Sequence, residues 1–210
     1  MQKLVVLDVD GVLLDTKIGG FKLLAEAVGK GEEMRKQHAE YEKRKHQGPW
    51  GLEQLAMLFA GISETKLNNH AIQIVDSTIM PEAYAVVQEL RKRNYLVVAY
   101  SSSPSWIMNY LKQKLGLDDI CANVLEVKDG NVTGKILQKM DRYGKKKHLL
   151  EFMTAHKLTK QDVIVVGDSV SDLPMAQHGT FYAFNTNDAV VVGAARQVIM
   201  PPLNNLLKYL

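Results

Sequence analysis

Short apolar runs rich in β-branched residues recur along the chain, and amphipathic helical patterns separate them. The apolar runs cover residues 3–8, 95–100, 162–166, 180–184 and, more briefly, 197–200. Runs that are apolar at almost every position are typical of strands buried on both faces of a parallel sheet. Helical patterns cover residues 82–93, 105–115 and 145–157. This alternation predicts an α/β fold built on a doubly wound parallel sheet.

The stretch 17–77 departs from this alternation. It contains only helical patterns, separated by glycines and a Gly-Pro pair, over residues 21–28, 32–45, 52–59 and 64–75. We therefore expect a small α-helical cap over 17–77, inserted after strand 1, and an α/β core made of 1–16 and 78–210. The segment 123–135 alternates on either side of Asp129-Gly130, which predicts a β-hairpin outside the main sheet.

Carboxylates follow two of the predicted strands, at the point where each strand ends. Asp8 and Asp10 end the first strand, and Asp168 and Asp172 follow the strand at 162–166. Ligands of open α/β sheets bind beyond the carboxyl ends of the strands, so these side chains should meet there. Four carboxylates at one edge raise one another's pKa unless a cation lies among them, and Mg²⁺ prefers oxygen ligands. A cation beside a carboxylate also suits attack on a phosphate dianion.

Four short motifs, in order along the chain, resemble those of the haloacid dehalogenase (HAD) superfamily. Residues 8–12 (Asp-Val-Asp-Gly-Val) resemble its first motif, and Ser101 after an apolar strand resembles its second. A lysine within 145–147, ahead of a helical pattern, resembles the third, and Gly167-Asp168 with Asp172 resembles the fourth. The helical cap and the hairpin are similar to those of the phosphoserine phosphatase branch. The resemblance implies a HAD-like Rossmannoid core and a Mg²⁺-dependent phosphatase.

The resemblance also implies a role for each carboxylate. Asp8 would be the nucleophile that forms an aspartyl-phosphate. Asp10 would protonate the leaving oxygen and then activate water. Mg²⁺ would be bound by Asp8, the backbone carbonyl of Asp10 and Asp168, with Asp172 in support. Two simpler interpretations stay open. Asp10 could serve merely to begin a turn, and Asp172 could be a first-turn aspartate that the helix dipole favours.

Hydroxyl groups and a lysine would hold the phosphoryl oxygens in this arrangement. The resemblance assigns this role to Ser101, with Ser102 beside it, although these serines could also cap a helix. Among the three consecutive lysines the interpretation favours Lys146, because the leucines three and four residues further on then face the core. Lys145 and Lys147 remain alternatives.

The substrate depends on the cap, where the chain departs from the phosphoserine phosphatase pattern. Those enzymes carry a glutamate after motif one for the substrate's amino group, and the matching position here is Lys17. Their cap arginine is matched by Leu55, and the Gly-Gly after the motif-two serine is Ser102-Ser103. Lys17 would repel an ammonium group and attract an anion. We therefore expect a small phosphorylated metabolite other than phosphoserine.

Three other functions are compatible with these motifs. A phosphoserine phosphatase or a phosphotransferase of the same family is the alternative within the class, because an aspartyl-phosphate can also pass its phosphoryl group to an alcohol. A non-catalytic binding or regulatory protein that retains the fold is the alternative from another class. The complete set of carboxylates and the motif-two serine argue against the last.

Composition limits the partners. The chain has 210 residues, and its net charge of +3, from 26 basic and 23 acidic residues, is too small to predict nucleic acid as a partner. No apolar run approaches the roughly 20 residues that span a bilayer. Asp8 and Asp10 interrupt the apolar N-terminal stretch, which argues against a signal peptide. The single Cys121 fits a reducing compartment. We expect a cytoplasmic enzyme acting on a small phosphomonoester, without a nucleic-acid or membrane partner.

Overall fold

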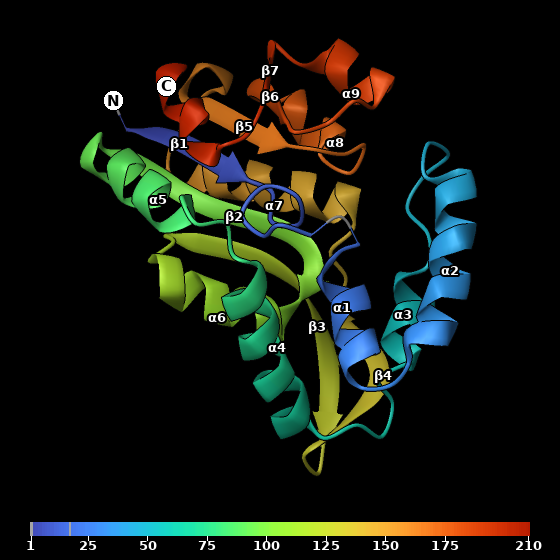
Figure 1. The fold of residues 1–210 in the computed structure, drawn as a ribbon. Helices are drawn as coiled ribbons and strands as arrows, with labels where there is room; N and C mark the ends of the chain where they lie inside the picture. The colour runs from blue at the N-terminus through green and yellow to red at the C-terminus, as the bar shows by residue number, and fades with distance from the viewer. Residues whose placement is uncertain (1, 17) are drawn as a thin grey trace.

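The computed structural model of the chain describes residues 2–16 and 18–210. Within these residues, seven strands form one sheet in the order β4-β3-β2-β1-β5-β6-β7 (Figure 1). The strands are β1 (Lys3–Leu7), β2 (Tyr95–Pro104), β3 (Asp119–Lys128), β4 (Asn131–Gln138), β5 (Val163–Gly167), β6 (Thr180–Phe184) and β7 (Gln197–Ile199). All neighbouring strands are parallel except β3 and β4. The predicted doubly wound α/β fold is therefore confirmed.

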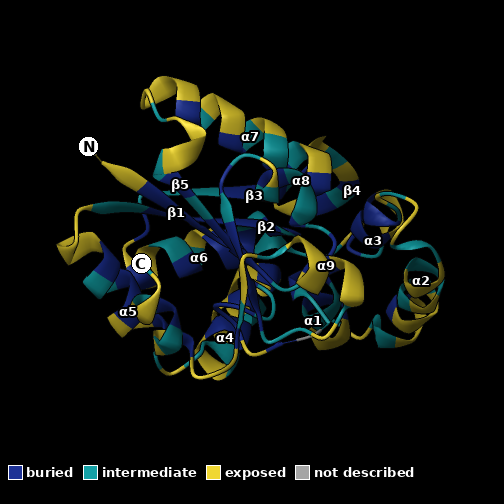
Figure 2. Cartoon of the chain, turned by 90° about the horizontal axis from the view of Figure 1, so that it is seen from above, coloured by how far each residue is buried: buried dark blue, intermediate teal, exposed yellow. Residues whose placement is uncertain are grey.

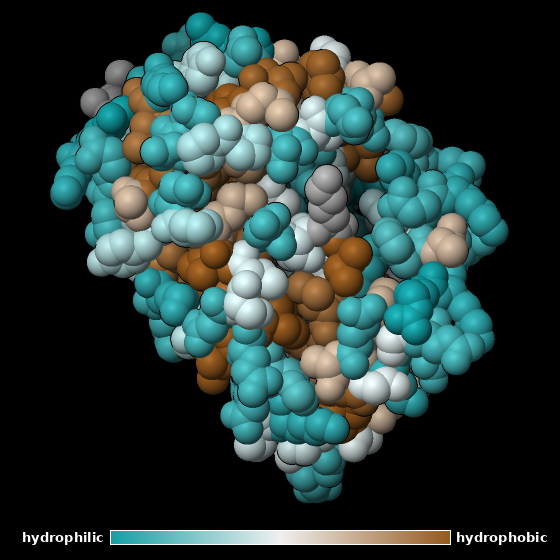
Figure 3. Space-filling model, viewed as in Figure 1, coloured by the Kyte–Doolittle hydropathy of each residue, from teal (hydrophilic) through white to brown (hydrophobic). Residues whose placement is uncertain are grey.

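Helices occupy most of the segments between the strands. They are α1 (Gly20–Ala27), α2 (Gly31–Arg44), α3 (Leu52–Met57), α4 (Glu64–Thr78), α5 (Ala83–Lys92), α6 (Ser105–Leu115), α7 (Arg142–Ala155), α8 (Leu173–Ala176) and α9 (Ala189–Ala194), with 3₁₀ turns at Lys160–Asp162 and Leu203–Lys208. Across the described residues, none of these helices is both long and apolar enough to cross a membrane. Hydrophilic side chains dominate the face seen in Figure 3, with apolar groups between them.

The central strand β1 is buried on both sides, and its alternation separates two cores. Val5 and Leu7 join one apolar cluster, while Leu4 and Val6 join the other. The first cluster contains the inner faces of α5 and α6, and the second contains those of α7, α8 and α9. Figure 2 shows the buried strands between helices whose outer faces are exposed. Because the sheet is covered on both faces, the polar residues at its carboxyl edge meet at one end of the molecule.

Four helices occupy the described part of 17–77. Helix α1 contacts α2, α4 and β2, and α3 contacts the edge strand β4. Helix α4 continues to Thr78 and packs along α6 of the sheet-bearing part. The helical content agrees with the sequence patterns, whereas the domain boundary at 17–77 stays a prediction.

The predicted hairpin is present and forms the edge of the sheet. Its turn, Asp129-Gly130, has positive φ at both residues, 50° and 76°, as a two-residue hairpin turn requires. The first residues of β3 pair with β2, for example Cys121 with Tyr100, before β3 turns to pair with β4. Among the strands of the described residues, 124–128 and 131–138 pair only with each other, so the hairpin leaves the parallel part of the sheet as the sequence predicts, and residues 119–121 join it to β2.

Candidate active site

The chain turns sharply after β1 and leaves two carboxylates at the edge of the sheet. The backbone N–H of Asp8 still donates to the carbonyl of Val166 at 2.8 Å, so Asp8 lies at the end of the β1–β5 ladder. The turn that follows needs Gly11, whose φ is +87°. A Cβ atom at this position would lie only 2.3 Å from Oδ2 of Asp168. The glycine therefore permits the close approach of this turn to the end of β5.

Three carboxylates converge between the ends of β1 and β5. One carboxylate oxygen from each of Asp8, Asp168 and Asp172 lies within 4.8 Å of the other two. Asp172 is fully buried and folds back beneath Gly167, where a Cβ would lie 2.4 Å from its Oδ2. The N–H of Ser169 donates to the same oxygen at 3.3 Å. The structure thus brings together three of the four carboxylates that the sequence singles out as metal ligands.

A buried lysine is paired with this cluster. The Nζ atom of Lys145 lies 2.7 Å from Oδ1 of Asp8 and 2.9 Å from Oδ1 of Asp172. It also donates to Oγ of Ser171 at 3.3 Å, and the residue is 1% exposed. Helix α7 brings it there, and Asp141 caps that helix by accepting hydrogen bonds from the N–H groups at 143 and 144.

Lys145, and not the favoured Lys146, reaches the carboxylates. The buried face of α7 repeats every four residues, at Lys145, Leu149 and Met153. Leu150, which the argument for Lys146 placed in the core, is 36% exposed. Lys146 instead lines a separate surface depression. The i, i+4, i+8 spacing of one lysine and two apolar residues was the signal for the correct helical phase.

The charges in this cluster do not balance. Burial, and then repulsion from Asp172, raises the pKa of Asp8 well above its usual range, although Lys145 opposes the shift. The same two causes raise the pKa of Asp168 to about 7. Burial alone would lower the pKa of Lys145, but the two carboxylates that it contacts raise it. Three carboxylates around one ammonium supply the oxygen ligands that a hard divalent cation such as Mg²⁺ prefers.

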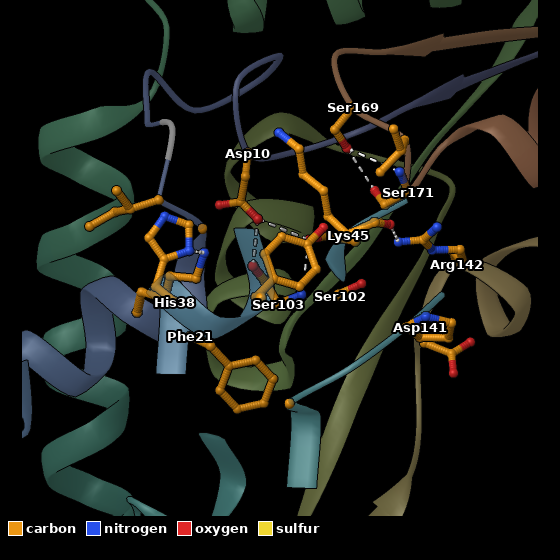
Figure 4. A pocket seen from close by; sticks show the side chains of 18 of the residues that line it. Asp10, Phe21, His38, Lys45, Ser102, Ser103, Asp141, Arg142, Ser169 and Ser171 are labelled. Carbon is orange, nitrogen blue, oxygen red and sulfur yellow. Dashed lines mark hydrogen bonds between the residues drawn. The ribbon is translucent and has the colours of Figure 1, made fainter. Parts of the chain in front are cut away.

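Asp10 lies beside the cluster and is held by hydroxyl groups from the end of β2. Oδ2 of Asp10 accepts hydrogen bonds from Ser103 at 2.8 Å and from Ser101 at 3.2 Å (Figure 4). Burial raises the pKa of this carboxyl group, and the two hydroxyl donors oppose the shift. Its Oδ1 is buried without a hydrogen-bond partner among the described residues. An acid with a raised pKa and a free oxygen can exchange a proton with a ligand.

Two polar residues that were not predicted for the site hold the end of β2 in place. Ser103 Oγ accepts from the N–H of Gly20 at 3.2 Å and so joins β2 to α1. Asn123 is fully buried, and its Nδ2 donates to the carbonyls of Ser102 at 2.6 Å and Met140 at 3.0 Å. Its Oδ1 accepts from the N–H of Met140 at 2.7 Å. This side chain ties the serine segment to the loop that leads into α7.

A cavity of about 380 Å³ opens over these residues. Asp8, Asp10 and Lys145 line its floor at the edge of the sheet, and residues of α1, α2 and the segment 49–55 line its wall. The predicted phosphate-binding residues Ser101 and Ser102 also line it. Lys17, the predicted substrate residue, lies outside the described residues.

The wall and the floor are joined by Arg142 at the start of α7. Its Nη2 donates to the backbone carbonyl of Lys45 at 2.6 Å and to that of Gly48 at 3.4 Å. The Nζ of Lys45 lies 4.0 Å from a carboxylate oxygen of Asp188, next to α9. These contacts fix the C-terminal end of α2 over the cavity.

This fold and this carboxylate–lysine cluster define a class of hydrolase. Residues 5–177 match the family model described as haloacid dehalogenase-like hydrolase, and the chain belongs to that family. Within the family, it is similar to proteins named phosphoserine phosphatase. The relative from Streptomyces coelicolor is 28% identical over 208 residues, which cover 98% of this chain and 50% of the relative. The relative from Methanocaldococcus jannaschii is 28% identical over 211 residues, which cover 100% and 98%.

The chain thus spans half the length of the Streptomyces coelicolor relative and nearly all of the Methanocaldococcus jannaschii one. Solved structures that resemble this chain include phosphoserine phosphatases as well. One described as a phospho-aspartyl intermediate analogue of phosphoserine phosphatase has a TM-score of 0.85 at 27% identity, covering 100% of this chain and 99% of the other. A substrate-bound phosphoserine phosphatase complex gives 0.84 at 26% identity with the same coverage. The expectation that phosphoserine is not the substrate gains no support from these names.

Proposed function

We propose that this protein is a phosphatase that hydrolyses a small phosphomonoester through an aspartyl-phosphate on Asp8. The observation that carries the proposal is the contact of the Lys145 ammonium with Asp8 and Asp172, at 2.7 and 2.9 Å, on the floor of a cavity. A carboxylate nucleophile and a phosphate are both anionic, and this buried cation reduces their repulsion. Asp10 lies at the same floor with one unpartnered oxygen.

In the proposed mechanism the reaction proceeds through two successive displacements at phosphorus. In the first, a carboxylate oxygen of Asp8 bonds to phosphorus while the bond from phosphorus to the ester oxygen breaks, and Asp10 gives that oxygen its proton. In the second, Asp10 takes a proton from water as the water oxygen bonds to phosphorus, and the bond to Asp8 breaks. Lys145 and the hydroxyl groups of Ser101 and Ser102 would hold the other phosphoryl oxygens.

The carboxylates of Asp8 and Asp168 would also form a site for Mg²⁺. Asp8 and Asp168 would bind it, with the backbone carbonyl of Asp10 as a further ligand and Asp172 in support. When bound, the ion neutralises charge on the carboxylates and the phosphoryl group. Asp172 is already paired with Lys145 and fully buried, which suits a supporting role.

The names of the relatives make phosphoserine the first substrate to test. The cavity of about 380 Å³ suits a molecule of this size. Phosphoserine carries both a carboxylate and an ammonium group, so comparison with phosphomonoesters that carry only one of them separates the relatives' substrate from the anionic substrate expected from Lys17.

A hydrolysis screen with and without Mg²⁺, run beside Asp8→Asn, tests the proposal. We expect phosphate release by the wild type only with the metal, and a loss of at least about 10³-fold in Asp8→Asn because its amide cannot form the covalent intermediate. Phosphate release should be repeated with an acceptor alcohol, since transfer to the alcohol would identify a phosphotransferase. Tight binding of a phosphomonoester without turnover would contradict the proposal and favour a binding protein.

A further inference from the structure

A lysine–histidine pair lies in the cavity wall and takes no part in the phosphoryl transfer described above. Lys22 belongs to α1 and His38 to α2, and Lys22 Nζ lies 2.6 Å from His38 Nδ1. The ammonium also lies over the ring of Tyr41, 5.4 Å from its centroid. All three residues line the same cavity as Asp8 and Asp10. Figure 4 shows His38 on the wall that faces Asp10.

The charge of Lys22 has no close counter-ion in the described part of the chain. No carboxylate oxygen there forms an ion pair with its Nζ within 4.0 Å. Glu42 and Asp10 act on it only at longer range, and Glu42 Oε1 lies 4.0 Å from the other ring nitrogen of His38. Burial lowers the pKa of Lys22 to about 8. The ammonium is therefore held in the cavity wall at a cost that an incoming anion would reduce.

His38 orients this ammonium. Its Nδ1 can accept the hydrogen bond only as a neutral imidazole with its proton on Nε2, a tautomer assigned from this contact. Burial, together with the charge of Lys22, lowers the pKa of His38 and so favours that neutral form. An ammonium has three N–H donors and His38 takes one, which leaves two for a ligand in the cavity.

We propose that Lys22, positioned by His38, binds a carboxylate group of the phosphomonoester whose phosphoryl group reacts at Asp8. The inference rests on the proposed function and deepens it by naming the substrate class. A singly charged carboxylate matches one ammonium, whereas a second phosphate dianion would be repelled more strongly by Glu42 and Asp10, which act on this position at longer range. Lys22 and Asp10 line the same cavity of about 380 Å³, so one small molecule bound there can meet both anion sites.

Steady-state kinetics with three phosphomonoesters test this inference. Phosphoglycolate carries a carboxylate, phosphoethanolamine carries an ammonium group, and phosphoserine carries both. For Lys22→Met we expect KM to rise about 10- to 100-fold for phosphoglycolate and phosphoserine, which is the range for losing a hydrogen bond to a charged group. The KM for phosphoethanolamine, and kcat for every substrate that reacts, should change less than about threefold. Lys22→Arg should keep most of the carboxylate preference.

Two further variants keep the test decisive. Lys22→Gln retains a polar side chain, and it should show the same selective rise in KM if Lys22→Met folds poorly. Lys36→Met is the matched control, because Lys36 lies on α2 with an exposed side chain that, among the described residues, forms an ion pair only with Glu32. This control should leave all three KM values unchanged.

The outcomes separate the two proposals. An equal change in KM for all three substrates, no change for any of them, or a wild type that hydrolyses only phosphoethanolamine would overturn the role of Lys22. These results would not contradict the proposed role of Asp8, because each of them requires an active enzyme. A wild type without Mg²⁺-dependent hydrolysis of any phosphomonoester would instead refute the proposed function, and the role of Lys22 with it.

Discussion

The ammonium of Lys145 lies 2.7 Å from the carboxylate of Asp8, and both side chains are almost completely buried. The two residues are separated by 137 positions in the sequence and come from α7 and the end of β1. A buried charge pair of this kind is costly to break, because the partner left behind cannot be solvated.

We therefore expect Lys145→Met to destabilise the metal-free protein by about 3–5 kcal/mol, the range for removing one partner of a buried ion pair. Addition of Mg²⁺ should recover part of this loss, because the metal provides the missing positive charge. Urea unfolding in EDTA and in Mg²⁺ measures both quantities. Lys146→Met, one residue along α7 and half-buried in a surface depression away from the carboxylates, should cost no more than about 1 kcal/mol. Equal losses in the two variants would show that Lys145 is not the essential lysine.

Gly11→Ala should impair the metal site selectively. A Cβ at Gly11 would meet Asp168 at 2.3 Å, whereas one at Gly29, with a similar φ of +84°, would meet nothing within 4 Å. Both substitutions force alanine into the left-handed region, which costs about 1–2 kcal/mol. Only Gly11→Ala also displaces Asp168, so we expect its Mg²⁺ activation constant to rise at least about 10-fold. Titration of activity with Mg²⁺ measures this, and matching behaviour of the two variants would contradict the account.

The proposed role of Lys22 predicts a pH dependence that differs between substrates. Its pKa is lowered to about 8 by burial, while Glu42 and Asp10 oppose the shift; His38 and the ring of Tyr41 also face the ammonium. In the free enzyme Lys22 is therefore charged below about pH 8 and loses its charge above it.

For phosphoglycolate, kcat/KM should then fall above about pH 8 relative to kcat/KM for phosphoethanolamine. Ionisations that affect kcat/KM for both substrates equally cancel in this ratio. In Lys22→Arg the fall should disappear, because a guanidinium stays charged over this range. A ratio that does not vary between pH 7 and pH 9.5 in the wild type would argue against carboxylate binding by Lys22.

Local sequence patterns predicted most of the fold. The helix at Ser105–Leu115 and the strand at Thr180–Phe184 occupy the residues expected for them, because each has a strong pattern bounded by clear start or stop signals. For the helix that carries the site lysine, the apolar pattern alone predicts a start at 145, whereas the helix begins at Arg142. Asp141, whose side chain caps it, was the signal that would have corrected its start and its phase.

The parts of the site that escaped prediction are contacts between distant segments. Asn123 joins the carbonyls of Ser102 and Met140, and Lys22 meets His38 across two helices. Neither contact leaves a pattern of spacing in the sequence, because only the packing of the elements brings these residues together. The carboxylates were predictable because strand ends place them at one edge whatever the details of packing.

The central claim is that Asp8 carries the phosphoryl group during turnover. Rapid acid quench of the wild type with ³²P-labelled phosphoserine or phosphoglycolate and Mg²⁺, followed by proteolysis and peptide mass spectrometry, tests it most directly. We predict label on the peptide that contains Asp8, lost on treatment with hydroxylamine as expected for an acyl phosphate, and absent from Asp8→Asn. Turnover without label at Asp8, or the same label in Asp8→Asn, would contradict the account.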